Sequence, residues 1–269
     1  MHERDRRRII LSAAQDRAIV TVSDLVELTG ASEATVRRDL DALATDQKIR
    51  RIRGGAEALA PRQFPGLAGR PFALNAGQRQ AEKAAIAQAA VAMCADGEPI
   101  IVNGGTTTFG MVHGLATRRL TVMTNSLPMA THLLENSRNQ VLLPGGAIYR
   151  EQNIVLSSFQ DDATQHFWAR RMFMGCQGIG PIGLMEADPL LIRAEERLMA
   201  RADELVVLAD SSKFAGRSSL VLCPLSRIHT IITDDGIGDR EAAMLEAAEV
   251  RLVAVSPGTG AAKTAVAGE

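Results

Sequence analysis

The sequence predicts an α/β protein with a small winged helix-turn-helix domain at its N-terminus, and three differences in residue pattern along the chain support this. Residues 1–56 have helical periodicity and many arginines. Residues 57–77 hold three prolines and three glycines without a sustained period, which is typical of a linker. Residues 78–255 alternate helical stretches with short apolar runs, and the small polar residues of 256–269 predict a flexible tail.

The composition is that of a soluble globular protein. Of the 269 residues 46% are hydrophobic, and the net charge of −1 gives the whole chain no attraction to nucleic acid or membranes. No apolar stretch reaches the length of about 18 residues that a membrane span needs. The charged start MHERDRRR predicts no signal peptide, so we expect a cytoplasmic protein. Cys94, Cys176 and Cys223 are too few and too far apart for a disulfide framework or zinc cluster, so we expect buried thiols and neither metal nor cofactor.

Residues 21–45 have the pattern of two helices joined by a short turn, behind a first helix whose apolar face is Ile9, Ile10 and Ala13. Thr21 or Ser23 can cap the earlier of the two helices, and Gly30 ends it as a C-terminal glycine does. Ser32 caps the later helix, in which Val36, Leu40 and Leu43 form a core face. The opposite face is polar and carries Arg37 and Arg38, as in a DNA-recognition helix.

A short basic segment follows this helix. Lys48, Arg50, Arg51 and Arg53 place four positive charges within residues 47–53, and Gly54-Gly55 predicts the turn of a strand–turn–strand wing. Residues 1–60 hold eleven basic and ten acidic residues, a net charge of only +1, so DNA binding depends on where the charges lie. The alternative is a solvated arginine-rich face on a small helical domain.

The segments SEATVRRDLDAL and KIRRIRGGAEAL resemble the N-terminal signature of the DeoR family of bacterial transcriptional regulators, over residues 3–59. The resemblance implies a winged helix-turn-helix that binds operator DNA, usually as a repressor, and a homodimer or homotetramer that places its helices on repeated half-sites. The residues that we expect to contact DNA are Ser32, Thr35, Arg37, Arg38, Lys48, Arg50, Arg51 and Arg53.

The apolar runs of residues 78–255 predict a largely parallel sheet, and several of them end in polar residues. In such sheets ligands bind beyond the carboxyl ends of the strands. The run IIVNGGTTTFG predicts an anion-binding loop before a helix that begins near Phe109. It is neither a P-loop nor a dinucleotide fingerprint, because no Gly-Lys-Ser/Thr follows and GxGxxG is absent. A tight turn without a ligand is the alternative.

The DeoR resemblance continues through GGTTT, TNSLP, LPGG, GIGPIGLMEAD and ADSSKF, and so covers about residues 3–255. It implies a sensor domain similar in fold to ribose-5-phosphate isomerase and the CoA transferases, with a phosphorylated sugar or sugar-derived metabolite as effector. The implied binding residues are Gly104, Gly105, Thr106, Thr107, Thr108, Asn125, Ser126, Gly145, Gly146, Glu195, Asp210 and Lys213.

Two positions depart from the family pattern. The family commonly has an aspartate where this chain has Asn103, and a lysine where this chain has Glu195. GGAEAL, VNGGTT and AEERLM resemble the subgroup that represses L-ascorbate utilisation, which suggests an acidic sugar-derived phosphate such as L-ascorbate 6-phosphate. A ligand that presents hydroxyls rather than a carboxylate would suit Glu195 and Asn103 as well.

Two other functions stay open: a DNA-tethered sugar-phosphate isomerase-like enzyme, and a DNA-binding protein with a non-functional pocket. An isomerase needs a carboxylate base beside the substrate. The candidates are Glu186, Asp188, Glu195 and Asp210, which we expect to be exposed acids. Asn103 cannot serve as a base, and we expect no paired acid beside the threonine loop, so the sequence favours a sensor without catalytic residues.

Overall fold

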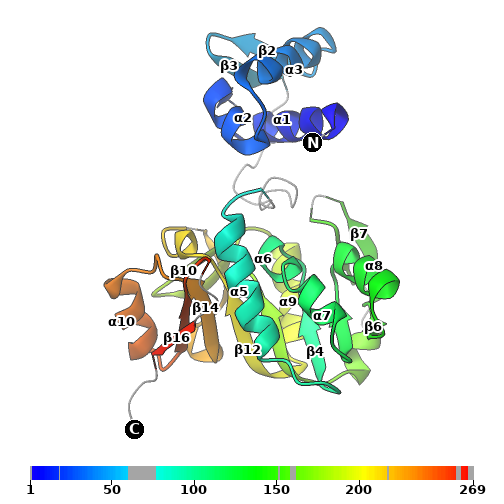
Figure 1. The fold of residues 1–269 in the computed structure, drawn as a ribbon, viewed down its shortest axis with the longest axis vertical. Helices are drawn as coiled ribbons and strands as arrows, with labels where there is room; N and C mark the ends of the chain where they lie inside the picture. The colour runs from blue at the N-terminus through cyan, green and yellow to red at the C-terminus, as the bar shows by residue number, and fades with distance from the viewer. Residues whose placement is uncertain are drawn as a thin grey trace. The chain divides into compact units, whose positions relative to one another are not determined.

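The computed structural model describes residues 2–17, 19–59, 77–150, 152–157, 162–216, 218–258 and 262–265. The chain divides into two compact units, Met1–Gln78 and Arg79–Glu269 (Figure 1). Most of the expected linker 57–77 lies outside the described residues, but Glu57 and Ala58 belong to a strand of the first unit. The wing therefore extends beyond the boundary at residue 56 that we expected.

The first unit is a winged helix-turn-helix. Its sheet has the order β1-β3-β2, and antiparallel β2 and β3 are joined by a turn at Gly54. Strand β1 was not expected; it is three residues long and pairs with β3 from Ile19↔Glu57 to Thr21↔Gly55. In chain order the elements are α1 (Glu3–Arg17), β1 (Ile19–Thr21), α2 (Val22–Thr29), α3 (Glu33–Thr45), β2 (Ile49–Ile52) and β3 (Gly55–Ala58).

The helix ends confirm the expected caps. The Thr21 hydroxyl accepts a hydrogen bond from the Asp24 N–H, and the Asp24 carboxylate accepts one from the Thr21 N–H, which is a capping box. Gly30 ends α2 with a left-handed φ of 64°, which glycine adopts without strain. Ser32 caps α3 by accepting from the Thr35 N–H. The turn between α2 and α3 is therefore fixed at both ends.

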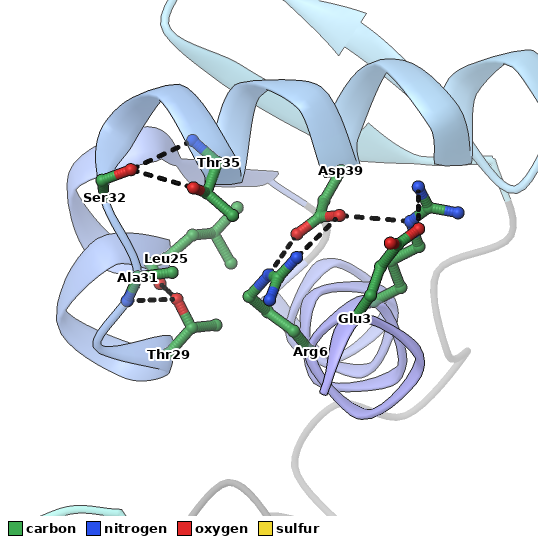
Figure 2. Close-up of polar contacts among 9 residues, drawn as sticks. Glu3, Arg6, Leu25, Thr29, Ala31, Ser32, Thr35 and Asp39 are labelled. Atoms are coloured by element: carbon green, nitrogen blue, oxygen red, sulfur yellow. Dashed lines mark hydrogen bonds and ion pairs between the residues drawn. The ribbon is translucent and has the colours of Figure 1, made fainter. Parts of the chain in front are cut away.

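The core of this unit holds α3 against α1 through apolar packing and one buried carboxylate. Val36, Leu40 and Leu43 are buried, as expected. Asp39 is only 2% exposed and binds two guanidinium groups of α1 (Figure 2). Its Oδ2 accepts from Arg6 Nε, and its Oδ1 accepts from Arg7 Nε at 3.1 Å. The pKa of Arg6 is raised by this hydrogen bond.

The second unit is built on an eight-stranded sheet with the order β16-β15-β14-β12-β9-β4-β5-β6. All neighbouring strands are parallel except β16, which is antiparallel to β15. The six apolar runs of the sequence correspond to β4 (Pro99–Val102), β5 (Thr121–Thr124), β6 (Gln140–Leu142), β9 (Ala169–Met174), β12 (Ala202–Leu208) and β14 (Thr230–Asp234). Chain order reverses between the adjacent strands β4 and β9, which makes this the switch point of the sheet.

Helices cover both faces of this sheet. One apolar cluster joins Ile100, Val102 and Phe173 to helices α5 (Gln80–Ala92), α7 (Val112–Ala116) and α8 (Leu127–Asn136), and Figure 1 shows α5 and α7 in front of the strands. The other cluster joins Ile101, Met172 and Met174 to α9 (Pro189–Met199) and α10 (Asp239–Ala247). Within the described ranges, no helix has both the length and the apolar character needed to cross a membrane.

Smaller elements complete the second unit. Strands β10 (Gly178–Gly180), β11 (Gly183–Glu186) and β13 (Leu220–Cys223) form an antiparallel sheet, and β7 (Ala147–Tyr149) pairs with β8 (Ile154–Leu156) as a hairpin. Short helices are α6 (Thr106–Phe109) and the 3₁₀ turns η1 (Ala163–His166), η2 (Ser211–Phe214) and η3 (Leu225–Arg227). The three cysteines are buried and unpaired, as expected.

The C-terminal segment 256–269 was expected to be a flexible tail, but it contains strand β16 (Ala262–Ala265). This strand pairs with β15 (Arg251–Val255) from Leu252↔Ala265 to Val255↔Ala262. An antiparallel edge strand needs only backbone hydrogen bonds to its neighbour, and Gly258, in the connection that precedes it, has a left-handed φ of 91°. The small side chains of this segment gave no sequence signal for a strand.

Replacing Asp39 with alanine should destabilise the first unit. The change removes a buried acceptor of charged hydrogen bonds and leaves Arg6, whose side chain is 13% exposed, without its partner. We expect the free energy of unfolding to fall by about 2–3 kcal/mol. Urea unfolding of Asp39→Ala measures this. The matched control is Asp41→Ala on the same helix, whose pair with Arg51 is at the surface and whose loss should cost under about 0.5 kcal/mol.

Candidate nucleic-acid interface and effector site

The exposed face of α3 carries the residues expected to contact DNA. Arg37 and Arg38 are exposed, and Arg37 pairs with Glu33 at 3.1 Å. The Ser32 and Thr35 hydroxyls lie 2.9 Å apart and hydrogen-bond each other, and the Ser32 hydroxyl also caps the helix by accepting from the Thr35 N–H (Figure 2). Ser32 and Thr35 therefore already have a structural role in the absence of DNA.

The wing presents its four basic side chains to solvent. Three of them pair with nearby acids: Lys48 with Asp46 at 3.4 Å, Arg50 with Glu57 at 3.3 Å and Arg51 with Asp41 at 3.0 Å. Surface pairs of this kind contribute about 0–1 kcal/mol, so a phosphate can replace the carboxylate at little cost. Arg38 and Arg53 have no ion-pair partner within the described part of the chain, and both are exposed.

The orientation of this surface depends on residues that sequence reasoning missed. Asp39 faces the core side of α3 and is bound by Arg6 and Arg7, so the angle of α3 against α1 is fixed by charged hydrogen bonds. An acid within a helix that otherwise carries solvent-facing acids gives no sign that it is buried. Its position three residues after Val36 and one before Leu40, on the same face, was the available signal.

The candidate effector site lies where the sheet reverses its strand order. The carboxyl ends of β14, β12, β9, β4 and β5 are neighbours there, so segments far apart in the sequence meet. Asn103 directly follows β4 and is tied to β9 twice. Its N–H donates to the Phe173 carbonyl at 3.0 Å, and its Oδ1 accepts from the Gly175 N–H at 3.2 Å.

The loop after Asn103 is held by side chains of its neighbours. Gly104 N–H donates to Asn125 Oδ1 at 2.7 Å, which links the loop to the end of β5. Thr108 Oγ1 donates to the carbonyls of Asn103 and Gly105 at 2.9 and 3.0 Å. Helix α6 begins at Thr106, not near Phe109 as expected, because Gly105 supplies the extended residue before it. The Thr106 and Thr107 hydroxyls make no hydrogen bond within the described residues.

The β7–β8 hairpin packs directly on this loop. A Cβ on Gly104 would lie 2.2 Å from Ile154 Cγ2, so only glycine fits under β8. Val155 N–H donates to the Asn125 carbonyl at 2.8 Å, and Tyr149 Oη donates to Asp188 Oδ2 at 2.8 Å at the start of α9. The hairpin therefore connects the loop, the end of β5 and α9.

A buried glutamate stands beside the loop, and a second one lies near it, contrary to expectation. Asn103 Nδ2 donates to Glu195 Oε1 at 2.9 Å, and Glu195 is 5% exposed. Glu186 at the end of β11 is also buried, as are Asp188 and Asp210. The expectations that these acids are exposed and that no paired acid lies beside the loop were wrong, because the buried face of α9 includes Leu191, Glu195 and Leu198. Their spacing of four and three residues was the missed signal.

The electrostatics of this pair favour the protonated acids. Burial raises the pKa of Glu186 to about 7, although the Ala187 N–H and the positive charge of Lys213 act in the opposite direction. Burial also raises the pKa of Glu195, and the negative charge of Glu186 raises it further. Two adjacent buried carboxyls without a full set of cations hold at least one proton near neutral pH.

A charged cluster occupies the end of β12. Arg79 Nη1 donates to Asp210 Oδ1 at 3.1 Å and to Ser211 Oγ at 2.9 Å. Burial alone would raise the pKa of Asp210, but hydrogen bonds from Ser212 and Arg79 and the charges of Lys213 and Lys83 lower it. Lys83 on α5 is 8% exposed, and burial lowers its pKa. Sequence reasoning missed Arg79 and Lys83, since both lie at the start of an ordinary amphipathic helix.

The remaining expected residues have structural explanations. Ser126 is the N-cap of α8 and accepts from the Met129 N–H at 3.4 Å. Gly145 and Gly146 are exposed, and the close neighbour of Gly146 is the Leu156 carbonyl of β8 rather than the loop. Lys213 is half-buried on η2, where its charge acts on both Asp210 and Glu186. The structure thus joins the loop, Asn125, Glu195, Asp210 and Lys213 at neighbouring strand ends.

Comparison with protein families matches residues 6–62 to a DeoR-like helix-turn-helix domain and residues 78–235 to a DeoR C-terminal sensor domain. The HTH-type transcriptional regulator UlaR of Shigella dysenteriae is 32% identical over 255 residues, which are 95% of this chain and 100% of that protein. UlaR of Escherichia coli O1:K1 has the same identity and coverage.

Solved structures give weaker matches. Ribose 5-phosphate isomerase A from Methanocaldococcus jannaschii has a TM-score of 0.37 and 16% identity, over 49% of this chain and 53% of that one. eIF2B delta from Chaetomium thermophilum has a TM-score of 0.39 and 13% identity, over 69% and 57%. Likeness at this level does not bear on function.

Glu186→Gln should flatten the pH dependence of stability. In the unfolded chain the pKa of this acid is the ordinary 4.5, whereas burial in the folded protein raises its pKa to about 7. The folded state binds more protons in that window, so wild-type stability falls as pH rises from about 4.5 to 7. We expect the Glu186 contribution to this loss to be on the order of 2–3 kcal/mol and to be absent in the variant, in which only the contribution of Glu195 remains.

Urea unfolding at pH 5, 6, 7 and 8 measures the difference. Glu196→Gln, at an exposed position of α9, is the control and should keep the wild-type slope. Parallel curves for wild type and Glu186→Gln would show that Glu186 is ionised throughout.

Proposed function

We propose, from the premise that this chain belongs to the DeoR family of helix-turn-helix transcriptional regulators, that it represses a carbohydrate catabolic operon and that a phosphorylated sugar-type effector modulates its binding to operator DNA. The observation that carries the proposal is the presence of a matched DNA-binding domain and a matched sensor domain on one chain. The first unit, Met1–Gln78, binds DNA, and the second, Arg79–Glu269, binds the effector.

Operator binding uses α3 and the wing. Helix α3 lies in the major groove, where its exposed residues contact base edges, and the wing arginines contact phosphates. A homodimer or homotetramer in the cytoplasm places two such helices on repeated half-sites. Arg38 and Arg53 are exposed and have no carboxylate partner among the described residues, which supports phosphate contact because no such partner has to be displaced.

Arg38→Ala should weaken operator binding by at least fivefold at 100 mM salt. Loss of one phosphate contact lowers affinity for all sequences and reduces the slope of log Kd against log salt by about 1. Fluorescence anisotropy with operator and random duplexes measures both quantities. Arg251→Ala, at an exposed position of the second unit, should behave like wild type. An unchanged salt slope in Arg38→Ala would remove this residue from the interface.

The effector site comprises the loop 104–108 with Asn125 and Lys213. Backbone N–H groups and the uncommitted hydroxyls of Thr106 and Thr107 bind the phosphate, and Lys213 supplies counter-charge. Motif resemblance to the L-ascorbate-utilisation subgroup makes L-ascorbate 6-phosphate the first compound to test. Binding is measured as a thermal shift, since a ligand of the folded state raises its midpoint.

Coupling between effector and operator starts at Arg79. This residue is the first of the second unit, and it binds Asp210 beside the effector site. The segment before it, 57–77, carries the change to the DNA-binding unit, and residues 60–76 of that segment lie outside the described part of the chain. The effector acts by favouring one of two arrangements of the two units.

The double variant Thr106→Val, Thr107→Val should lose the effector response and keep operator binding. Valine preserves shape but removes both hydroxyls, so we expect the affinity for the effector to fall at least tenfold, as for two lost hydrogen bonds to a charged group. Titration with L-ascorbate 6-phosphate and a panel of sugar phosphates, with and without operator, measures this. Thr117→Val, at the exposed end of α7, is the control. A normal response in the double variant would move the phosphate site elsewhere.

The buried acids give a reason to test one alternative function, a sugar-phosphate isomerase-like enzyme. Glu186 and Glu195 with raised pKa values are the kind of groups that transfer protons in isomerases. Incubating the protein with sugar phosphates and following products by NMR separates the functions: turnover supports an enzyme, whereas a thermal shift without turnover supports a sensor. Neither turnover nor a shift would indicate a non-functional pocket.

A further inference from the structure

A small cavity lies between the β7–β8 hairpin and α9. It measures about 10 Å³, which is room for one water-sized group. The end of β5, β8, the residue before η1 and α9 all contribute to its walls, through Asn125, Val155, Asp162, Ala194, Arg197 and Leu198. Apart from Asn125, none of these residues belongs to the effector site described above.

Asn125 connects this cavity to the effector loop. Its side chain is buried, and its Oδ1 accepts from the Gly104 N–H at 2.7 Å, which fixes the orientation of the amide. The other end of the amide, Nδ2, makes no hydrogen bond within the described residues. Because Asn125 lines the cavity, this buried donor is available to an acceptor oxygen placed there.

The hairpin brings the loop and the cavity together. Ile154 of β8 packs on Gly104, and the next residue, Val155, lines the cavity. The Val155 N–H also donates to the Asn125 carbonyl at 2.8 Å, so β8 is fixed to the end of β5 at this point. One ligand can therefore contact the loop and the cavity on either side of Asn125.

The charged wall of the cavity is already balanced. Asp162 Oδ2 accepts from Arg197 Nη2 at 3.1 Å, and Asp162 Oδ1 accepts from the Thr164 N–H at 2.9 Å. Burial alone would raise the pKa of Asp162, but hydrogen bonds from Ser157 and Thr164 and the charge of Arg197 lower it. A charged ligand group would have to disrupt this ion pair, and a carboxylate is also larger than the space. The cavity therefore favours a small uncharged oxygen.

We propose that this cavity is a second subsite for the effector, which takes a hydroxyl or carbonyl oxygen from a part of the ligand other than its phosphate. Asn125 Nδ2 donates to that oxygen, and Val155, Ala194 and Leu198 enclose the carbon that carries it. The proposal rests on the proposed effector site at 104–108 and adds a specificity subsite under the hairpin.

Filling the cavity tests the proposal. Ala194→Leu adds an isopropyl group to the wall and leaves the loop residues unchanged. We expect it to weaken binding of the tightest among L-ascorbate 6-phosphate, D-glucitol 6-phosphate and D-ribose 5-phosphate by at least tenfold, and to change the affinity for inorganic phosphate less than twofold. Isothermal titration of the full-length protein measures both. Equal losses for both kinds of ligand, or no loss for either, would overturn the proposal.

A second variant and a control accompany this measurement. Ala194→Met fills the same space with an unbranched, flexible side chain and should give the same selective loss. Ala243→Leu, at an exposed position of α10, is the matched control and should bind every ligand like wild type.

The hydroxyl contact has its own comparison. n-Hexyl phosphate has a carbon chain of similar length but no hydroxyl, so it should bind wild type no more tightly than inorganic phosphate. If it binds as tightly as the best sugar phosphate, the cavity does not select an oxygen and the proposal is wrong.

Methyl NMR of wild type decides the question even if neither variant at Ala194 folds. The Val155 and Leu198 methyl signals should shift with the tightest sugar phosphate and stay in place with inorganic phosphate; unshifted signals would overturn the subsite. Sugar phosphates that bind no more tightly than inorganic phosphate would overturn only the present proposal. Absence of binding by inorganic phosphate and by all three sugar phosphates would overturn the effector site as well.

Discussion

The placement of Asn103 at the reversal of strand order is the constraint on which the sensor unit depends. Its backbone and side chain join β4 to β9, its amide fixes Glu195 on α9, and its carbonyl accepts from Thr108 to shape the loop. An aspartate at this position could not donate to Glu195 and would add a third carboxyl to the buried pair. The departures at positions 103 and 195 therefore belong together as one hydrogen-bonded arrangement.

The DNA-binding unit also depends on hydrogen bonds of a buried side chain. Asp39 binds two arginines of α1, so the angle of α3 is set by directional hydrogen bonds in addition to the non-directional packing of Leu40 and Leu43. In both units a buried carboxyl group fixes a functional segment. In the first it is paired with two arginines, whereas in the second burial raises its pKa and an amide holds it.

Local sequence signals predicted the helix ends and most strands of the main sheet. The features that sequence reasoning missed depend on contacts between residues far apart in the chain. Thr21, Gly30 and Ser32 act on the residues next to them, so the helix ends could be located from the sequence. The apolar runs gave six strands of the main sheet, but β1 and β16 depend on backbone pairing with distant partners. Glu195 was named as an effector residue, yet its burial beside Asn103, 92 positions earlier, follows from the sheet order and not from its neighbours.

The ion pairs on the DNA face have a consequence for how the protein searches for its operator. Asp46, Glu57 and Asp41 already pair with Lys48, Arg50 and Arg51, so on the proposed interface duplex DNA competes with these carboxylates for the cations. Fewer small ions are exchanged than the number of basic side chains suggests, and random DNA gains less from the wing. On the proposed interface the internal acids compete weakly with phosphates for these cations, which leaves a larger share of the binding energy to base contacts.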